Sequence, residues 1–136
     1  AWVAADTIRR HFQDTGRDFG DYDLVATGDL AAVGHPMAAE LLREAGYEPG
    51  DRFADCGLLL YDRRRQDVHA GGSGCACSGI VFGAGFYPDL YEGRLRRLLL
   101  VSTGSLHNKM TWEQGQSIPT VAHAVAFEHA GEEASP

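Results

Sequence analysis

The sequence predicts an α/β domain in which helices cover the faces of a β-sheet. Three observations predict this class. Helical and strand patterns alternate along the 136 residues, one central apolar segment has no polar side, and the last strand carries alanine at every second position. At this length the chain is the size of one domain and can bury a modest core.

The first helix and strand follow from the spacing of apolar residues. Ala4, Ile8 and Phe12 recur at helical spacing, so residues 2–14 should form an amphipathic helix. An apolar centre followed by turn residues predicts a short strand at 23–28.

The next two segments are a helix and a less regular strand. Pro36 suits the first position of a helix, and an apolar stripe runs from it to Gly46, a suitable helix end. Residues 57–61 are apolar but interrupted by Gly57, which predicts an irregular strand or extended segment.

A helix over 75–92 is predicted to be buried on all sides, because few of its residues are polar. Gly79, Gly83 and Gly85 each cost about 1 kcal/mol of helix propensity relative to alanine. That cost is tolerable if other backbones press close to this helix. Pro88 should kink the helix or begin a second short turn.

Two strands complete the domain. "RRLLLVSTG" predicts a strand near 96–103, and "TVAHAVAFE" alternates as a strand does. The all-alanine side of the second strand indicates that a helix or second layer packs unusually close to it. His123, on the opposite side, is expected to be a satisfied core histidine. Residues 131–136 should form a polar tail.

The net charge limits the partners that the chain is expected to bind. A net charge of −7 opposes non-specific binding to nucleic acid or to an acidic membrane. The arginine clusters at 63–65 and 94–97 are expected to be solvated, and no apolar run approaches the ~20 residues that span a bilayer.

The chain opens within a helical pattern and without an initiator Met, so we expect a piece of a longer protein or a processed product.

The three cysteines, Cys56, Cys75 and Cys77, are an odd number and include a C-x-C pair that is poorly placed to bridge itself. A secreted disulfide framework is therefore not expected, and an intracellular location fits better. Structural zinc sites usually show C-x2-C spacing, so we expect neither a metal nor another cofactor.

Cys75 and Cys77 allow two interpretations. A thiol near a helix N-terminus has a lowered pKa, and His69 or His123 could then serve as the base of a nucleophilic cysteine. Alternatively, both cysteines are small buried hydrophobic residues, as free cysteines usually are. We favour the second interpretation.

Five segments carry a family resemblance. They are "TGDLAAVG" (27–34), "DCGLLLYD" (55–62), "QDVHAGGSGCACSG" (66–79), "LLVSTGSL" (99–106) and "GQSIPTVAHAVAFE" (115–128). In this order, over about residues 5–129, the chain resembles the C-terminal half of the stage V sporulation protein AD family.

The resemblance implies the second half of a thiolase-like fold, in which α-β-α-β-α layers enclose central helices between two mixed sheets. Residues 1–130 would form this C-terminal domain, and the N-terminal half would be absent from the chain. The implied function is non-catalytic: binding of dipicolinic acid and participation in its uptake into the forespore. The alternative is an acyl-transferring enzyme of the thiolase superfamily.

The same resemblance implies where the protein works and with what. The expected location is intracellular, in the forespore or spore and peripheral to the inner membrane. The expected partners are dipicolinic acid, the N-terminal half, a second copy in a homodimer and membrane proteins of the transport apparatus, but no nucleic acid. Met110 and Trp112, in the long loop 104–119, are candidate contacts for those membrane proteins.

Catalytic motifs of thiolases are replaced in this chain. Ser73 falls where the G-H-P-x-G motif has its histidine, and Gly28-Asp29-Leu30 stands in place of an N-E-A-F-type motif. Residues 116–119, Gln-Ser-Ile-Pro, replace C-x-G-G-G. The comparison therefore weakens the enzyme interpretation.

A binding role would explain the glycine-rich loop. Dipicolinate is a flat dianion, and backbone N–H groups of Gly71 to Gly74 could bind an anion at the start of a helix without any lysine. Equally, the loop could form only a tight turn into that helix. The candidate ligand-binding residues are His69, Gly71, Gly72, Ser73, Gly74, Cys75, Gln116 and Ser117, and Thr103 and His107 should lie on the same side.

Overall fold

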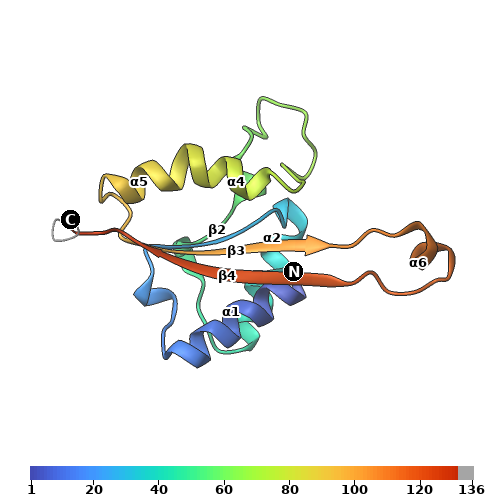
Figure 1. The fold of residues 1–136 in the computed structure, drawn as a ribbon, viewed down its shortest axis with the longest axis horizontal. Coiled ribbons are helices and arrows are strands. Elements are labelled where there is room, and N and C mark those ends of the chain that lie inside the picture. The colour runs from blue at the N-terminus through green and yellow to red at the C-terminus, as the bar shows by residue number, and fades with distance from the viewer. Residues whose placement is uncertain (132–136) are drawn as a thin grey trace.

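The computed structural model describes residues 1–131 as a four-stranded mixed sheet with helices on both faces (Figure 1). In the order in which they lie side by side, the strands are β2 (Phe53–Asp55), β1 (Leu24–Thr27), β3 (Arg97–Ser105) and β4 (Thr120–Glu128). The first three are parallel, and β4 runs antiparallel to β3. The α/β class is confirmed, and the architecture is consistent with a thiolase-like half-domain.

The helices are divided between the two faces of the sheet (Figure 1). On one face lie α1 (Trp2–Thr15) and α2 (Ala31–Glu44), and on the other lies a continuous helical segment made of α4 (Cys77–Val81), η3 (Phe82–Phe86) and α5 (Tyr87–Tyr91). The short elements are η1 (Phe19–Asp21), η2 (Gly50–Arg52), α3 (Cys56–Leu59) and α6 (Lys109–Glu113). Among the described residues, none of the helices combines the length and apolar character that crossing a bilayer requires.

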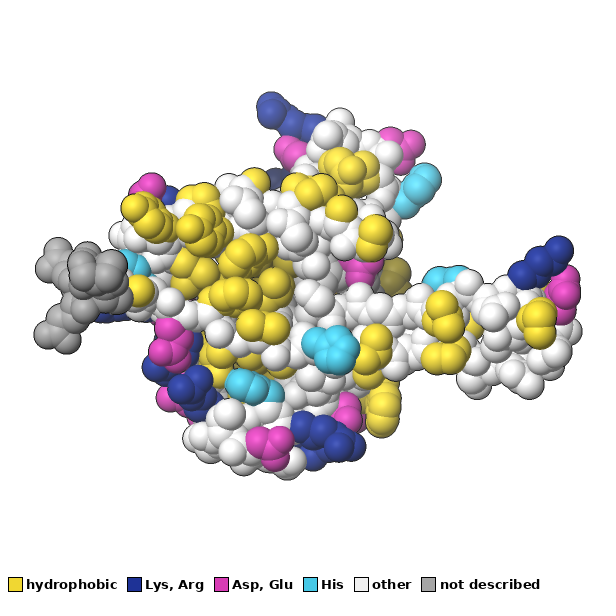
Figure 2. Space-filling model, viewed as in Figure 1, with side chains coloured by type: hydrophobic (Ala, Val, Ile, Leu, Met, Phe, Trp, Pro, Cys, Tyr) yellow, Lys and Arg dark blue, Asp and Glu magenta, His cyan; other side chains and the backbone are white. Residues whose placement is uncertain are grey.

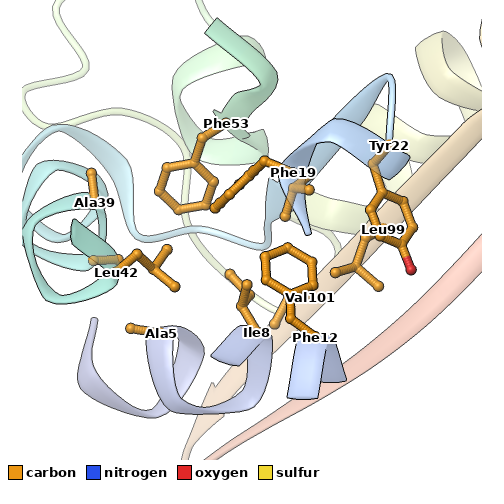
Figure 3. Close-up of a cluster of buried hydrophobic side chains, with 12 residues drawn as sticks. Ala5, Ile8, Phe12, Phe19, Tyr22, Ala39, Leu42, Phe53, Leu99 and Val101 are labelled. Atoms are coloured by element: carbon orange, nitrogen blue, oxygen red, sulfur yellow. The ribbon is translucent and has the colours of Figure 1, made fainter. Parts of the chain in front are cut away.

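The larger core lies between the sheet and the pair α1 and α2 (Figure 3). The predicted helix at 2–14 is confirmed, and its apolar residues Ile8 and Phe12 are buried against the sheet. Gly16 ends α1 in the left-handed conformation with φ 68°, which glycine adopts without strain. Tyr22 is also buried, and its hydroxyl lies 2.6 Å from Nε2 of His11.

The second helix begins earlier than predicted. Instead of starting at Pro36, α2 starts at Ala31 and contains Pro36 within it. The reason is tertiary: the Asp55 carboxylate, on the neighbouring strand, accepts the amides of Leu30 and Ala31 at 2.8 Å each. These bonds satisfy two of the amides that a helix N-terminus leaves without partners, and a capping residue distant in sequence gives no local signal.

The prediction of an extended segment at 57–61 is wrong. The strand β2 lies at Phe53–Asp55, and the helical turn α3 follows it directly. Asp55 again explains the change, because its side chain accepts the amide of Leu58 at 3.2 Å and so caps α3.

The alanine side of β4 is covered at Ala122 and Ala124, as predicted, but Ala126 is exposed. Ala122 and Ala124 pack on the larger core, where α1 lies against β4. The opposite side differs from the prediction: His123 is exposed rather than in the core, and Val125 beside it is 49% exposed. In the described part of the chain, α4 to α5 do not reach over this end of β4.

The helix predicted over 75–92 is covered on one side only within this chain, so its burial on all sides stays a prediction that needs cover from outside the chain. Val81 and Phe86 of the helical segment are buried against the sheet, but Ile80 and Tyr87 on its outer side are 52% and 55% exposed. A turn of π-helix occupies η3, where the Tyr87 amide donates to the Phe82 carbonyl. Figure 2 shows hydrophobic side chains gathered over this helical segment and along β4.

The loop between β3 and β4 projects from the domain as a long arm (Figure 1). It contains α6, which the Asn108 side chain caps by accepting the amide of Met110. Met110 and Trp112 are 64% and 78% exposed. The strands themselves agree with the predicted ones at β1, β3 and β4, and of the polar tail the structure describes only Gly131.

Candidate ligand-binding site

A pocket of about 700 Å³ opens at the carboxyl ends of β1 and β3. These strands are parallel neighbours, so the residues that follow them meet at one edge of the sheet, where α/β proteins usually bind ligands. Small and hydroxyl-bearing residues form much of the wall, including Gly28, Ser73, Ser78, Ser102, Thr103 and Ser105.

The glycine loop, residues 71–74, forms one side of this pocket and is pressed against α3. Gly71 and Gly74 have φ values of 132° and 107°, a region that favours glycine. The Gly72 amide donates to the Gly57 carbonyl at 2.7 Å, and a Cβ on Gly71 would lie 2.6 Å from that carbonyl oxygen. The glycines therefore permit close contact between two backbones, as well as a turn.

Asp29 connects three elements at the mouth of the pocket. Its Oδ2 accepts the Gly74 amide at 3.0 Å and the Ser73 hydroxyl at 3.1 Å. Its Oδ1 accepts the Thr103 hydroxyl at 3.0 Å. Asp29 thus ties the end of β1 to the glycine loop and to β3, and it is half-buried in the wall of the pocket.

Most amides of the glycine loop have partners within the chain. Gly71 donates to the Val68 carbonyl at 2.9 Å, Gly72 to Gly57, and Gly74 to Asp29. Of the four loop amides, only that of Ser73 has no hydrogen-bond partner among residues 1–131. The loop is accordingly less available to an anion than its sequence alone indicates.

The remaining polar side chains of the pocket are neutral or weakly basic. Ser102 donates to the Ser78 hydroxyl at 3.3 Å, and the Ser105 hydroxyl lies 2.9 Å from Nε2 of His107. The lining residues within the described chain include neither lysine nor arginine. Among the lining side chains of residues 1–131, Asp29 is therefore the one with a fixed charge, and that charge is negative.

The cysteines occupy different environments. Cys75 is exposed and lines the pocket, whereas Cys56 and Cys77 are buried. Burial raises the pKa of the Cys77 thiol, and the nearby Asp29 and Asp55 carboxylates raise it further. Burial likewise raises the pKa of Cys56 to about 12. Both buried thiols stay protonated near neutral pH, which is the state of a small hydrophobic residue and not of a nucleophile.

The structure brings only some of the predicted residues together. Ser73, Gly74 and Cys75 line the pocket, joined by Thr103 and His107. Gly71 and Gly72, in the first half of the loop, do not line the pocket and instead pack on α3. Outside the lining are His69, which is exposed with φ 48°, and Gln116 and Ser117, which are exposed beyond α6 in the arm.

Sequence reasoning missed the roles of two carboxylates. From the sequence, Asp29 was identified only within a replaced thiolase motif and Asp55 was not singled out, yet Asp55 is 1% exposed and accepts four hydrogen bonds. The available signal was an aspartate at or just after the end of each of two short strands, because side chains there reach the same edge of a parallel sheet. Across residues 1–131, no group of three or more His, Cys, Asp or Glu side chains is placed to hold a metal ion.

Comparison with known proteins places these features in a family. The family model described as stage V sporulation protein AD matches residues 1–128. Stage V sporulation protein AD of Bacillus subtilis (strain 168) is 49% identical over 129 residues, which are 95% of this chain and 38% of that protein. The chain therefore spans well under half the length of the curated relative it matches.

Proposed function

Because the chain belongs to the stage V sporulation protein AD family, and so has a role in sporulation, we propose that it is the C-terminal half of a non-catalytic dipicolinate-binding protein. The complete protein takes part in dipicolinate uptake into the forespore, at the periphery of the inner membrane. The observation that carries the proposal is the hydroxyl-lined pocket at the strand ends, which includes Ser73, Gly74 and Cys75 from the predicted set.

The size and chemistry of the pocket support a small polar ligand. At about 700 Å³ it lies within the range of small-molecule sites, and it has ample room for one substituted pyridine ring. Serine and threonine hydroxyls can donate to carboxylate oxygens or accept from a protonated group. The small side chains leave flat surfaces against which an aromatic ring can lie.

The thiols support a non-catalytic role. A cysteine nucleophile needs a lowered pKa or an adjacent base, and the pKa of Cys77 is raised by burial. Among residues 1–131, no histidine is hydrogen-bonded to a cysteine. The exposed thiol of Cys75 keeps acyl transfer as the second candidate, since it faces the pocket. Acyl-CoA turnover that disappears in Cys75→Ala would favour that candidate.

The N-terminal half is the proposed cover of the open side of the helical segment. Ile80, Tyr87 and Tyr91 are more than half exposed there, and Val121 and Val125 of β4 are nearly half exposed. Figure 2 shows hydrophobic side chains gathered on this face. Contiguous apolar surface of this kind marks an interaction site in soluble proteins. An N-terminal half would also close the pocket, which this chain lines on one side only. A homodimer of the complete protein is part of the same proposal.

A contact with membrane proteins of the transport apparatus is proposed for the arm. Met110 and Trp112 are exposed on α6, and Leu106, where the arm begins, is 64% exposed. If these side chains bind such partners, Trp112→Ala should reduce co-purification of the complete protein with the membrane fraction. Undiminished recovery would exclude Trp112 as the contact.

The test of the proposed function is equilibrium binding of dipicolinate to the complete two-half protein. Ser73→Trp fills the pocket beside Asp29 and is expected to weaken binding at least about tenfold. Ser117→Trp is the matched control, because Ser117 is exposed but does not line the pocket. Equal affinity in both variants would place the ligand elsewhere and contradict the proposal.

A further inference from the structure

We propose that Asp29 is a specificity-determining residue of the pocket, which keeps the carboxylates of the ligand away from the glycine loop. This inference rests on the proposed function and names the part of the ligand that the loop accepts. The loop receives an uncharged part of the ligand, such as the edge of an aromatic ring, and the carboxylates lie further from β1.

Asp29 already accepts from the donors that a ligand carboxylate would use. The Ser73 hydroxyl and the Gly74 amide both donate to its Oδ2, at 3.1 and 3.0 Å. A carboxylate of the chain itself therefore occupies the position that the sequence suggested for the ligand. A second carboxylate could take those donors only by displacing Asp29 from them.

One donor of the glycine loop, the Ser73 amide, remains for a ligand. The Ser73 amide has no partner among residues 1–131, but it is adjacent in the chain to the Gly74 amide that Asp29 accepts. Consecutive amides lie within about 4 Å of each other, since consecutive Cα atoms are about 3.8 Å apart. An anion bound at Ser73 would therefore meet the negative charge of Asp29 at short range, where like charges repel strongly.

No other side chain in the described part of this wall offsets the charge of Asp29. The described lining residues include no lysine or arginine, and the imidazole of His107 is in contact with the Ser105 hydroxyl. Asp29 is also fixed from a third side by the Thr103 hydroxyl at 3.0 Å. Three hydrogen bonds therefore hold the carboxylate in place.

The test compares two probes on the complete two-half protein: dipicolinate and its neutral analogue pyridine-2,6-dicarboxamide. The measured quantity is the ratio of their affinities, because a general weakening of the pocket changes both affinities together. In Asp29→Asn, the ratio of dipicolinate to diamide affinity should rise by about tenfold, as removal of one short-range like-charge contact allows. Asp51→Asn is the matched control, since Asp51 is exposed on η2 and remote from the lining.

The outcomes separate this inference from the proposed function. An unchanged or lower ratio in Asp29→Asn, with binding retained, would overturn the inference alone. Absence of dipicolinate binding in the unsubstituted protein would remove both. Asp29→Ser, which keeps a hydroxyl acceptor without the charge, should show the same rise. If neither variant folds, as judged by thermal unfolding, Asp29 serves stability and the inference is wrong.

Discussion

Gly57 and Gly72 meet backbone to backbone: the Gly72 amide donates to the Gly57 carbonyl at 2.7 Å. A Cβ on Gly57 would lie 2.5 Å from the Gly72 carbonyl oxygen and 2.9 Å from Oδ1 of Asp55. Neither neighbour can move freely, because one belongs to the glycine loop and the other caps two helices. This contact sets the position of the loop that forms one side of the pocket.

Gly57→Ala is therefore expected to destabilise the chain. Overpacking of a tight contact costs about 1–3 kcal/mol, and here the obstructing atom is backbone, so the free energy of unfolding should fall by about 2 kcal/mol. Urea unfolding measures the change. Gly79→Ala is the control: no atom lies within 4 Å of its Cβ position, so stability should be unchanged or rise by up to about 1 kcal/mol. Equal losses in the two variants would contradict this account.

Asp55→Ala should be more damaging. Asp55 accepts the Thr27 hydroxyl and the amides of Leu30, Ala31 and Leu58, all at the junction of β1, β2 and their helices. Buried donors left without acceptors cost about 1–3 kcal/mol each, so a loss of at least about 3 kcal/mol is expected. Thermal or urea unfolding tests this, with Asp51→Ala as the exposed control. A loss below about 1 kcal/mol would show that water replaces the carboxylate.

Thiol labelling should distinguish the three cysteines. Cys75 is exposed, and burial raises the pKa of Cys77 and, to about 12, that of Cys56. Because the thiolate is the reactive form, iodoacetamide near pH 8 should modify one cysteine in the folded chain and three after unfolding. Mass spectrometry counts the adducts. Cys75→Ser should abolish labelling of the folded chain, and rapid labelling of Cys77 would contradict the burial argument.

The raised pKa of Cys56 also predicts a pH dependence of stability. A thiol whose pKa is higher in the folded state binds its proton more tightly there than in the unfolded chain. The resulting stabilisation is complete below the ordinary value of 9.0 and is lost as the pH rises toward about 12. Unfolding free energies measured from pH 8 upward should fall less steeply in Cys56→Ala than in the unsubstituted chain. Parallel curves would assign the alkaline loss to other groups.

Ile80→Lys tests the proposed cover by the N-terminal half. In the 136-residue chain Ile80 is 52% exposed, so the free energy of unfolding should change by less than about 0.5 kcal/mol. In the complete protein a covered lysine should cost at least about 2 kcal/mol. Val33→Lys is the control. Val33 is an exposed apolar residue on α2, on the other face of the sheet, and the substitution should be tolerated in both the 136-residue chain and the complete protein. Tolerance of Ile80→Lys in the complete protein would contradict the proposed cover.

Local sequence patterns were sufficient to predict an element where that element buries one face against the core. The 3.6-residue spacing in α1 and the alternation in β4 predicted both elements, and the alanine side of β4 predicted the close approach of α1. They failed at α2, whose start is set by Asp55 from a different strand, and at α3, which the same Asp55 caps from the position directly before it. The cap of α2 comes from 24 or 25 residues away, so the residues beside the start of this helix carry no signal of it.

Composition and spacing alone therefore determined the α/β class, most of the elements and the segments that carry the family resemblance. Only the tertiary structure decided which side of the long helical segment is covered and how the glycine loop uses its amides. Apolar spacing is local, so a sequence reports it directly. The partners of a carboxylate such as Asp29 depend on which strand ends the sheet brings together, and only the assembled sheet determines that.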